Sequence, residues 1–172
     1  MTDVGFEQAE FTRHDDHIVA RFRLTLDNHV EEVWAALTQP EQLPQWLAPG
    51  EIAPQAGGEA HLDFGESGIV IRSAVTAYEP PRLLEYSWSG PGEPVRPLRW
   101  EVEPIGAMSV LTLTLTTPAG EDPGRAAAGW AAHLEMLAAA LAGAPIRFPF
   151  EVFKAARDTY REQVGALVGE IA

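Results

Sequence analysis

Hydrophobic and polar residues alternate along residues 17–26, where one face carries Ile18, Ala20, Phe22, Leu24 and Leu26. A period of two places these side chains on one side of a strand, so the pattern predicts a half-buried β-strand. The same pattern predicts further strands at about 51–55, 59–64, 69–79, 82–88, 98–104 and 108–117, with glycine or proline in the breaks between them. Because the connections are short, we expect an antiparallel meander.

Residues 27–47, between the first strand and the others, have helical spacing instead. The i, i+3, i+4, i+7 spacing of one buried helix face is met by Val30, Val33, Trp34 and Leu37. Asn28, with Glu31 three residues later, is the predicted N-terminal cap. Pro40 ends this helix, and we expect a second, short or distorted helix that places Leu43, Trp46 and Leu47 on one side.

A long helix is predicted at residues 123–141. Asp122 and Pro123 are suited to its cap and first position, Gly143 to its C-terminal end, and its apolar stripe is formed by Trp130, Leu134, Leu137 and Leu141. Residues 144–150 contain two prolines and are predicted to be a linker, followed by an amphipathic segment at 151–168. The apolar stripe of this last segment needs cover, from its own domain or from a second copy of the chain, as in a homodimer.

Composition restricts the function. The 172 residues fit one domain, and a net charge of −13 would repel nucleic acid and anionic lipid headgroups. Cysteine is absent, which excludes disulfides, thiolate metal sites and cysteine nucleophiles. Neither a signal peptide nor an apolar run long enough to span a membrane is found, so a cytoplasmic protein is expected.

The order of a strand, a helix pair, six strands and a long helix resembles the helix-grip fold of the START-like superfamily, also called SRPBCC or polyketide-cyclase-like. Three phrases resemble homologues of the activator of heat-shock protein 90 ATPase, namely VEEVWAALTQPEQLPQWL at 30–47, PRLLEYSW at 81–88 and GWAAHLEML at 129–137. The resemblance covers residues 18–142. It implies an α+β domain at 1–143, in which a curved antiparallel sheet of six or seven strands wraps around the long helix, and an apolar cavity lies between them. Residues 144–172 would add a linker and a C-terminal helix.

The residues expected to contact a ligand in this cavity come from the helix pair, the strands and the long helix. They are Trp46, Leu47, Phe64, Ile71, Tyr86, Trp88, Trp100, Leu113, Trp130, His133, Leu134 and Leu137. We expect Trp34 to lie in the core, and Trp46 and Leu47 to lie at the mouth of the cavity.

Motifs for catalysis or metal binding are weak. Residues 14–17, His-Asp-Asp-His, have metal-ligand side chains but are interpreted as a solvated lead-in to the first strand. His61 and Asp63 are interpreted as an outer, solvated strand face, and Arg72 is expected to point outward. We find none of the hydrolase, dinucleotide-binding, P-loop or zinc-protease motifs, so no metal, cofactor or catalytic residue is assigned.

The leading hypothesis is a protein that binds an apolar or lipid-like small molecule between the sheet and the long helix. One alternative is a cyclase or dehydratase that acts in the same cavity and uses His133, Tyr86 or a nearby acid for proton transfer. A second alternative is a chaperone-interacting module. The sequence favours binding over catalysis, because it shows no convergent set of polar groups.

Overall fold

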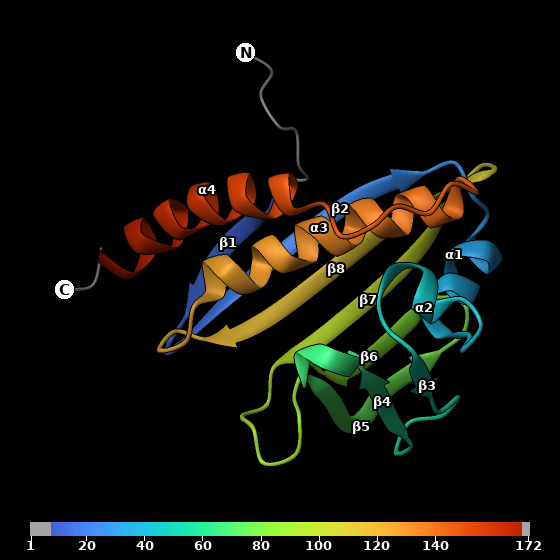
Figure 1. Cartoon of the computed structure of the whole chain (residues 1–172), viewed down its shortest axis with the longest axis horizontal. Coiled ribbons are helices and arrows are strands. Elements are labelled where there is room, and N and C mark those ends of the chain that lie inside the picture. Colours follow the sequence, from blue (N-terminus) through green and yellow to red (C-terminus); the bar gives the residue numbers. More distant parts are fainter. Residues whose placement is uncertain (1–7, 170–172) are drawn as a thin grey trace.

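One curved, eight-stranded antiparallel sheet wraps around a long helix in this computed structural model, which describes residues 8–169 (Figure 1). In chain order the elements are β1 (Glu10–His14), β2 (His17–Leu26), α1 (Val30–Thr38), α2 (Leu43–Trp46), β3 (Gly50–Ile52), β4 (Glu59–Asp63), a 3-10 turn η1 (Gly65–Ser67), β5 (Val70–Glu79), β6 (Leu83–Ser87), β7 (Pro97–Ile105), β8 (Met108–Pro118), α3 (Pro123–Leu141) and α4 (Phe150–Gly169). The strand order is β1-β2-β8-β7-β6-β5-β4-β3. The predicted helix-grip fold is confirmed.

The number of strands is one or two higher than predicted. The additional strand β1 forms a hairpin with β2, in which Phe11 lies opposite Ala20. The polar lead-in expected before residue 17 is therefore part of the sheet. Every predicted strand from residue 17 onward is present, with ends that differ by up to three residues.

The cap of α1 lies one residue later than predicted. His29 occupies the N-cap position, and its backbone N–H donates to the Glu32 carboxylate at 3.3 Å. The Asn28 side-chain amide donates both to the Glu32 carboxylate at 3.2 Å and to the Leu141 carbonyl at the end of α3 at 3.1 Å. Asn28 therefore joins the start of the helix pair to a carbonyl that α3 cannot satisfy internally.

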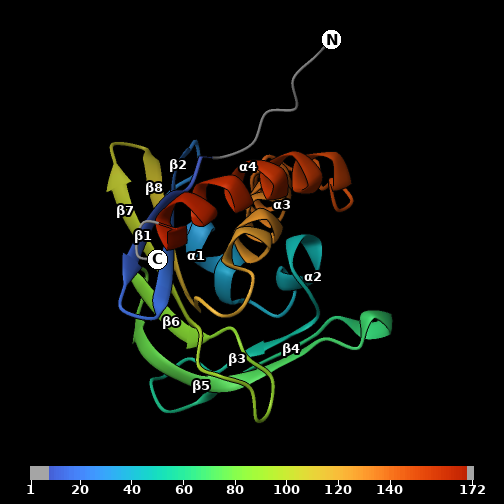
Figure 2. The same ribbon diagram turned by 90° about the vertical axis from the view of Figure 1, so that its left-hand side faces the viewer.

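The sheet curves around α3 (Figure 2), and the core residues come from the concave face of the sheet, from α3 and from the other helices. Strand alternation is as predicted, since Ile18, Ala20, Phe22, Leu24 and Leu26 are all buried. The predicted stripe of α3 is buried at Trp130, Leu134 and Leu137, while Leu141 at the helix end is half-buried. Trp34 lies in the core, as expected.

Helix α4 runs back along α3 in the opposite direction and packs on its own domain (Figure 1). Its apolar stripe is buried at Ala156, Tyr160 and Val164, and the Tyr160 ring centroid lies 5.3 Å from that of Phe11 on β1. Packing on its own domain and packing on a second copy of the chain were the two alternatives for this stripe, and the structure shows the first. Among residues 8–169, no helix is long and apolar enough to cross a membrane.

The two long helices are in close contact at Gly124. A Cβ atom placed there would lie 2.8 Å from the backbone nitrogen of Arg161 on α4, so the contact requires glycine. The Arg161 side chain closes the same contact, because its Nε donates to the Asp122 carboxylate at 3.0 Å. That ion pair holds the pKa of the Asp122 carboxyl below its usual value.

Replacing Gly124 by alanine should destabilise the protein. The added Cβ would have to push α4 away from α3, and overpacking of this kind costs about 1–3 kcal/mol. Urea unfolding measures the change. Gly129→Ala on the same helix is the matched control, because a Cβ there meets no atom within 4 Å, and replacing an open helical glycine by alanine adds about 0.5–1 kcal/mol. Equal stability of the two variants would contradict the close contact.

Candidate functional site

A continuous series of aromatic rings crosses the space between the sheet and α3. Starting from α2, ring centroids follow one another at 5.7 Å from Trp46 to Trp100, 5.5 Å to Trp130 and 4.7 Å to Trp88. The series continues at 5.8 Å from Trp88 to Phe64, 6.2 Å to His133 and 5.5 Å to Phe148. Most pairs meet edge to face, the arrangement that aromatic quadrupoles favour. We call these seven residues the aromatic cluster.

The inner end of the cluster is closed. Trp46 and Trp100 are almost completely buried, and the Trp46 indole N–H donates to the Ala36 carbonyl at 2.8 Å. Trp46 and Leu47 are thus buried, and the expectation that they form a mouth is wrong. Pro44 lies in the first turn of the short helix α2, where a proline costs no helical hydrogen bond. The helix therefore forms and buries its apolar residues.

Tyr86 on β6 is buried beside this inner end. Its hydroxyl is hydrogen-bonded to the Trp100 side chain, and burial raises the pKa of the Tyr86 hydroxyl well above its usual value. A group so enclosed cannot exchange protons readily with a ligand at the surface. The structure therefore gives Tyr86 a packing role.

The outer end of the cluster reaches solvent at Phe64, Trp88 and His133, which are half-buried. They come from three places, since Phe64 follows β4, Trp88 follows β6 and His133 lies on α3. Ile69, whose carbonyl accepts a hydrogen bond from the Phe64 N–H, is 54% exposed. We call Phe64, Trp88 and His133 the aromatic rim.

Trp88 is held in the rim by Arg96, across the loop between β6 and β7. The two residues share a backbone hydrogen bond of 2.7 Å, and the Arg96 Nη1 donates to the Trp88 carbonyl at 3.0 Å. The remaining guanidinium donors of Arg96 bind both carboxylate oxygens of Glu121, just before α3, at 2.7 and 2.8 Å. This bidentate pair fixes the loop relative to the helix.

His133 has one ring nitrogen satisfied and one open. The Trp46 carbonyl can only accept, so Nδ1 carries the proton and donates to it at 2.9 Å. Burial lowers the pKa of His133, partly offset by this hydrogen bond, so the ring is neutral at neutral pH. Nε2 then has a free lone pair and has no hydrogen-bond partner among residues 8–169.

The twelve residues expected to contact a ligand are brought together, but mostly as packed core. Nine are buried, namely Trp46, Leu47, Ile71, Tyr86, Trp100, Leu113, Trp130, Leu134 and Leu137, and only the three rim residues are half-buried. The side chains of the nine buried residues fill the space between the sheet and α3. Phe148, which completes the cluster from the linker, was not predicted.

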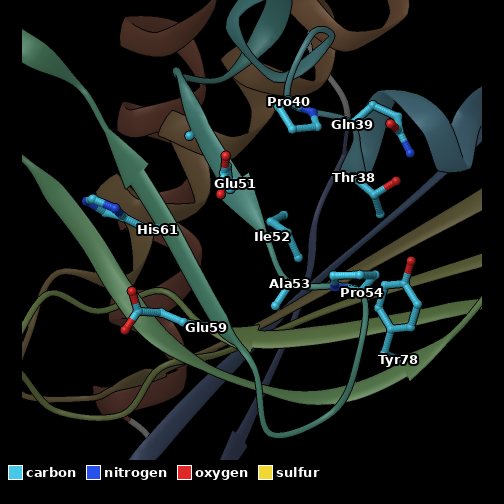
Figure 3. Close-up of a pocket in the computed structure, with 11 residues that line it drawn as sticks. Thr38, Gln39, Pro40, Glu51, Ile52, Ala53, Pro54, Glu59, His61 and Tyr78 are labelled. Carbon is cyan, nitrogen blue, oxygen red and sulfur yellow. The ribbon is translucent and has the colours of Figure 1, made fainter.

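A hollow of about 540 Å³ lies elsewhere, beside the short edge strand β3 (Figure 3). Its walls include Thr38 at the end of α1, Pro40 just after that helix, Ile52 on β3 and Tyr78 near the end of β5. None of the twelve predicted residues lines it. Its carboxylates are exposed, and Glu59 is paired with Arg72 at 3.1 Å.

Arg72 points outward as expected, and the strand face of His61 and Asp63 is exposed.

The histidines near the N-terminus lie at the β1–β2 hairpin. His17 Nδ1 is 2.8 Å from an Asp16 carboxylate oxygen, while His14 Nε2 is 3.4 Å from the Thr12 hydroxyl. Within the described part of the chain, no three histidine, aspartate or glutamate side chains gather at metal-binding distance.

Comparison with known proteins identifies the family. The model of the Activator of Hsp90 ATPase homolog 1-like protein family matches residues 27–142, about two-thirds of the chain. The chain belongs to this family. The resemblance predicted from residues 18–142 is thereby confirmed, and α4 lies beyond the matched segment. No curated protein sequence matches the chain significantly.

Solved structures of similar proteins share the fold of this family member. The protein encoded by BPP1335 of Bordetella parapertussis is 31% identical, with 95% of each chain covered and a TM-score of 0.71. CalU16 from Micromonospora echinospora is 23% identical over 94% of this chain and 98% of its own, with a TM-score of 0.72. The Aha1 dimer from Colwellia psychrerythraea is 19% identical over 72% of this chain and 95% of its own, with a TM-score of 0.62.

His133 should make the stability of the protein depend on pH. Its pKa is lower in the folded state than in the unfolded chain, so its contribution to stability is present above the unfolded value of about 6.5 and is lost as the pH falls below it. We expect His133→Asn, which keeps a donor for the Trp46 carbonyl but does not titrate, to lose less stability between pH 7.5 and 5. Urea unfolding at each pH measures this. Parallel losses in both proteins would contradict a neutral His133 whose pKa is lowered by partial burial.

Proposed function

We propose that the protein binds a neutral, apolar small molecule at the aromatic rim, where the sheet meets α3. The observation that carries this proposal is the half-buried state of Phe64, Trp88 and His133, which continue the fully buried core to the surface. Apolar side chains with one convergent polar atom are the usual composition of small-molecule sites. The chain also belongs to a START-like family, whose fold leaves room for an apolar ligand between the sheet and the long helix, and this supports the same function.

The charge of the protein favours a neutral ligand. The net charge of −13 would repel an anionic amphiphile. At the rim the only ring atom with a free lone pair is the neutral His133 Nε2. The guanidinium of Arg96, which donates to the Trp88 carbonyl, is already bound to Glu121. A ligand at this place therefore gains most from apolar contact and from one hydrogen bond.

The open Nε2 of His133 also favours a second candidate function, a cyclase-type or dehydratase-type enzyme that acts at the same place. A neutral imidazole with a free lone pair can accept a proton from a bound substrate, and the Trp46 carbonyl would hold the resulting imidazolium by its Nδ1–H. Catalysis would need a proton donor besides, and buried Tyr86 does not offer one. Binding needs only the rim, which is why we prefer it.

Binding can be tested with N-phenyl-1-naphthylamine, a neutral probe that fluoresces in apolar surroundings. We expect it to bind and to raise the melting temperature. Trp88→Ala should weaken binding about tenfold, since a central aromatic contact is typically worth 1–2 kcal/mol. Val95→Ala, at a 67% exposed residue of the same loop, is the matched control and should leave the affinity unchanged.

Two results would count against the proposal. The first is the absence of any stabilisation or fluorescence change with this probe and with a panel of neutral aromatic and lipid-like compounds. The second is equal binding by wild type, Trp88→Ala and Phe64→Ala, each shown to be folded by circular dichroism, because the ligand would then bind away from the rim. In the second case the hollow beside β3 becomes the site to examine.

A further inference from the structure

The linker between the two long helices places one of its own rings on the proposed site. Phe148 packs on His133, with ring centroids 5.5 Å apart, and is half-buried. The same ring contacts Phe150 at 4.9 Å and Phe153 at 5.9 Å, at the start of α4. Phe148 thus covers His133 with an apolar ring supplied by the chain itself.

The segment that carries Phe148 is weakly held. Residues 144–147 are exposed and belong to no helix or strand. A backbone hydrogen bond of 2.9 Å from Ala144 to Ala139 ends α3, and one of 3.1 Å from Phe153 to Pro149 begins α4. Between them, within the described chain, residues 145–148 make no backbone hydrogen bond. Segments with exposed backbone and few buried contacts open at low free-energy cost.

The contact between Phe148 and His133 leaves one polar atom unsatisfied. His133 Nε2 is an acceptor, and a phenyl ring carries no O–H or N–H to donate. Phe64 and Trp130 make ring contacts with His133 at 6.2 and 5.7 Å, and within the described chain neither donates a hydrogen bond to Nε2. A better occupant of this place would have the flat apolar shape of the Phe148 ring and also a hydrogen-bond donor.

We propose that the ligand is a planar aromatic molecule with a hydroxyl or N–H group, which displaces the Phe148 ring from His133 and donates to Nε2. This rests on the proposed function and names the class of ligand. Phe148 acts as an internal competitor, so the apparent affinity is the intrinsic affinity reduced by the fraction of molecules in which Phe148 has moved away.

The experiment compares 1-naphthol with 1-methoxynaphthalene, which has the same ring system but no donor, by quenching of tryptophan fluorescence at neutral pH. Wild type should bind 1-naphthol about 3- to 10-fold more tightly, the usual effect of one hydrogen bond. Phe148→Ala should bind both compounds on the order of fivefold more tightly, because the competitor is gone. Ile146→Ala, at an exposed position of the same linker, should change neither affinity.

The variant His133→Asn tests the proposed hydrogen bond from the ligand to Nε2. Its amide N–H can keep the hydrogen bond to the Trp46 carbonyl, while its shorter side chain places no acceptor at the position of Nε2. The preference for 1-naphthol should therefore disappear while 1-methoxynaphthalene still binds. Equal affinity of wild type for the two compounds, or a preference that survives in His133→Asn, would overturn the ligand class but leave the proposed function standing. Unchanged affinities in Phe148→Ala would overturn the displacement. If neither compound, nor N-phenyl-1-naphthylamine, binds to wild type or to Phe148→Ala, the proposed function fails as well.

Discussion

The packing of Trp130 against the sheet is the contact on which the rest of the structure depends. An isolated helix with the composition of α3 would be marginal in water, so it is stabilised by burying its stripe in the concave face of the sheet. Trp130 lies at the centre of that contact, 4.7 Å from the ring of Trp88 and 5.5 Å from that of Trp100. Trp130 also contacts His133 at 5.7 Å. The packing of Trp130 that holds α3 against the sheet therefore also positions the aromatic rim. The fold and the candidate site depend on the same aromatic residues.

Local periodicity was enough to predict most of the fold. The strand β2 and the helix α3 were predicted within one residue, because burial on one face imposes a period of two or of 3.6. Periodicity did not predict β1, because its five residues contain only one large apolar side chain, Phe11. This strand is stabilised by β2 and by Tyr160, which is about 150 residues away in the sequence. The cap of α1 was misplaced for a similar reason, because Asn28 binds the distant Leu141 carbonyl.

The site was less accessible from the sequence than the fold. The sequence indicated which aromatic residues face the interior, but the choice between lining a cavity and filling it depends on ring angles. Trp46 and Trp100 meet at 88°, edge to face, which fills the space. The hollow beside β3 joins Thr38, Ile52 and Tyr78, which share no sequence pattern. Phe148 lies outside the segment that resembles the family, so no motif pointed to it.

The position of Phe148 follows from a contact that lies about midway along α4. Gly124 allows the backbone of Arg161 to lie against the start of α3, which sets the register of two antiparallel helices. Both helices rise about 1.5 Å per residue, so counting back from this contact places Phe150 opposite about residue 135 of α3. The linker must therefore return from Leu141 along the outside of α3 for nearly two turns, and its last residues arrive beside His133. A glycine that lets two helices touch thus determines which ring covers the candidate site.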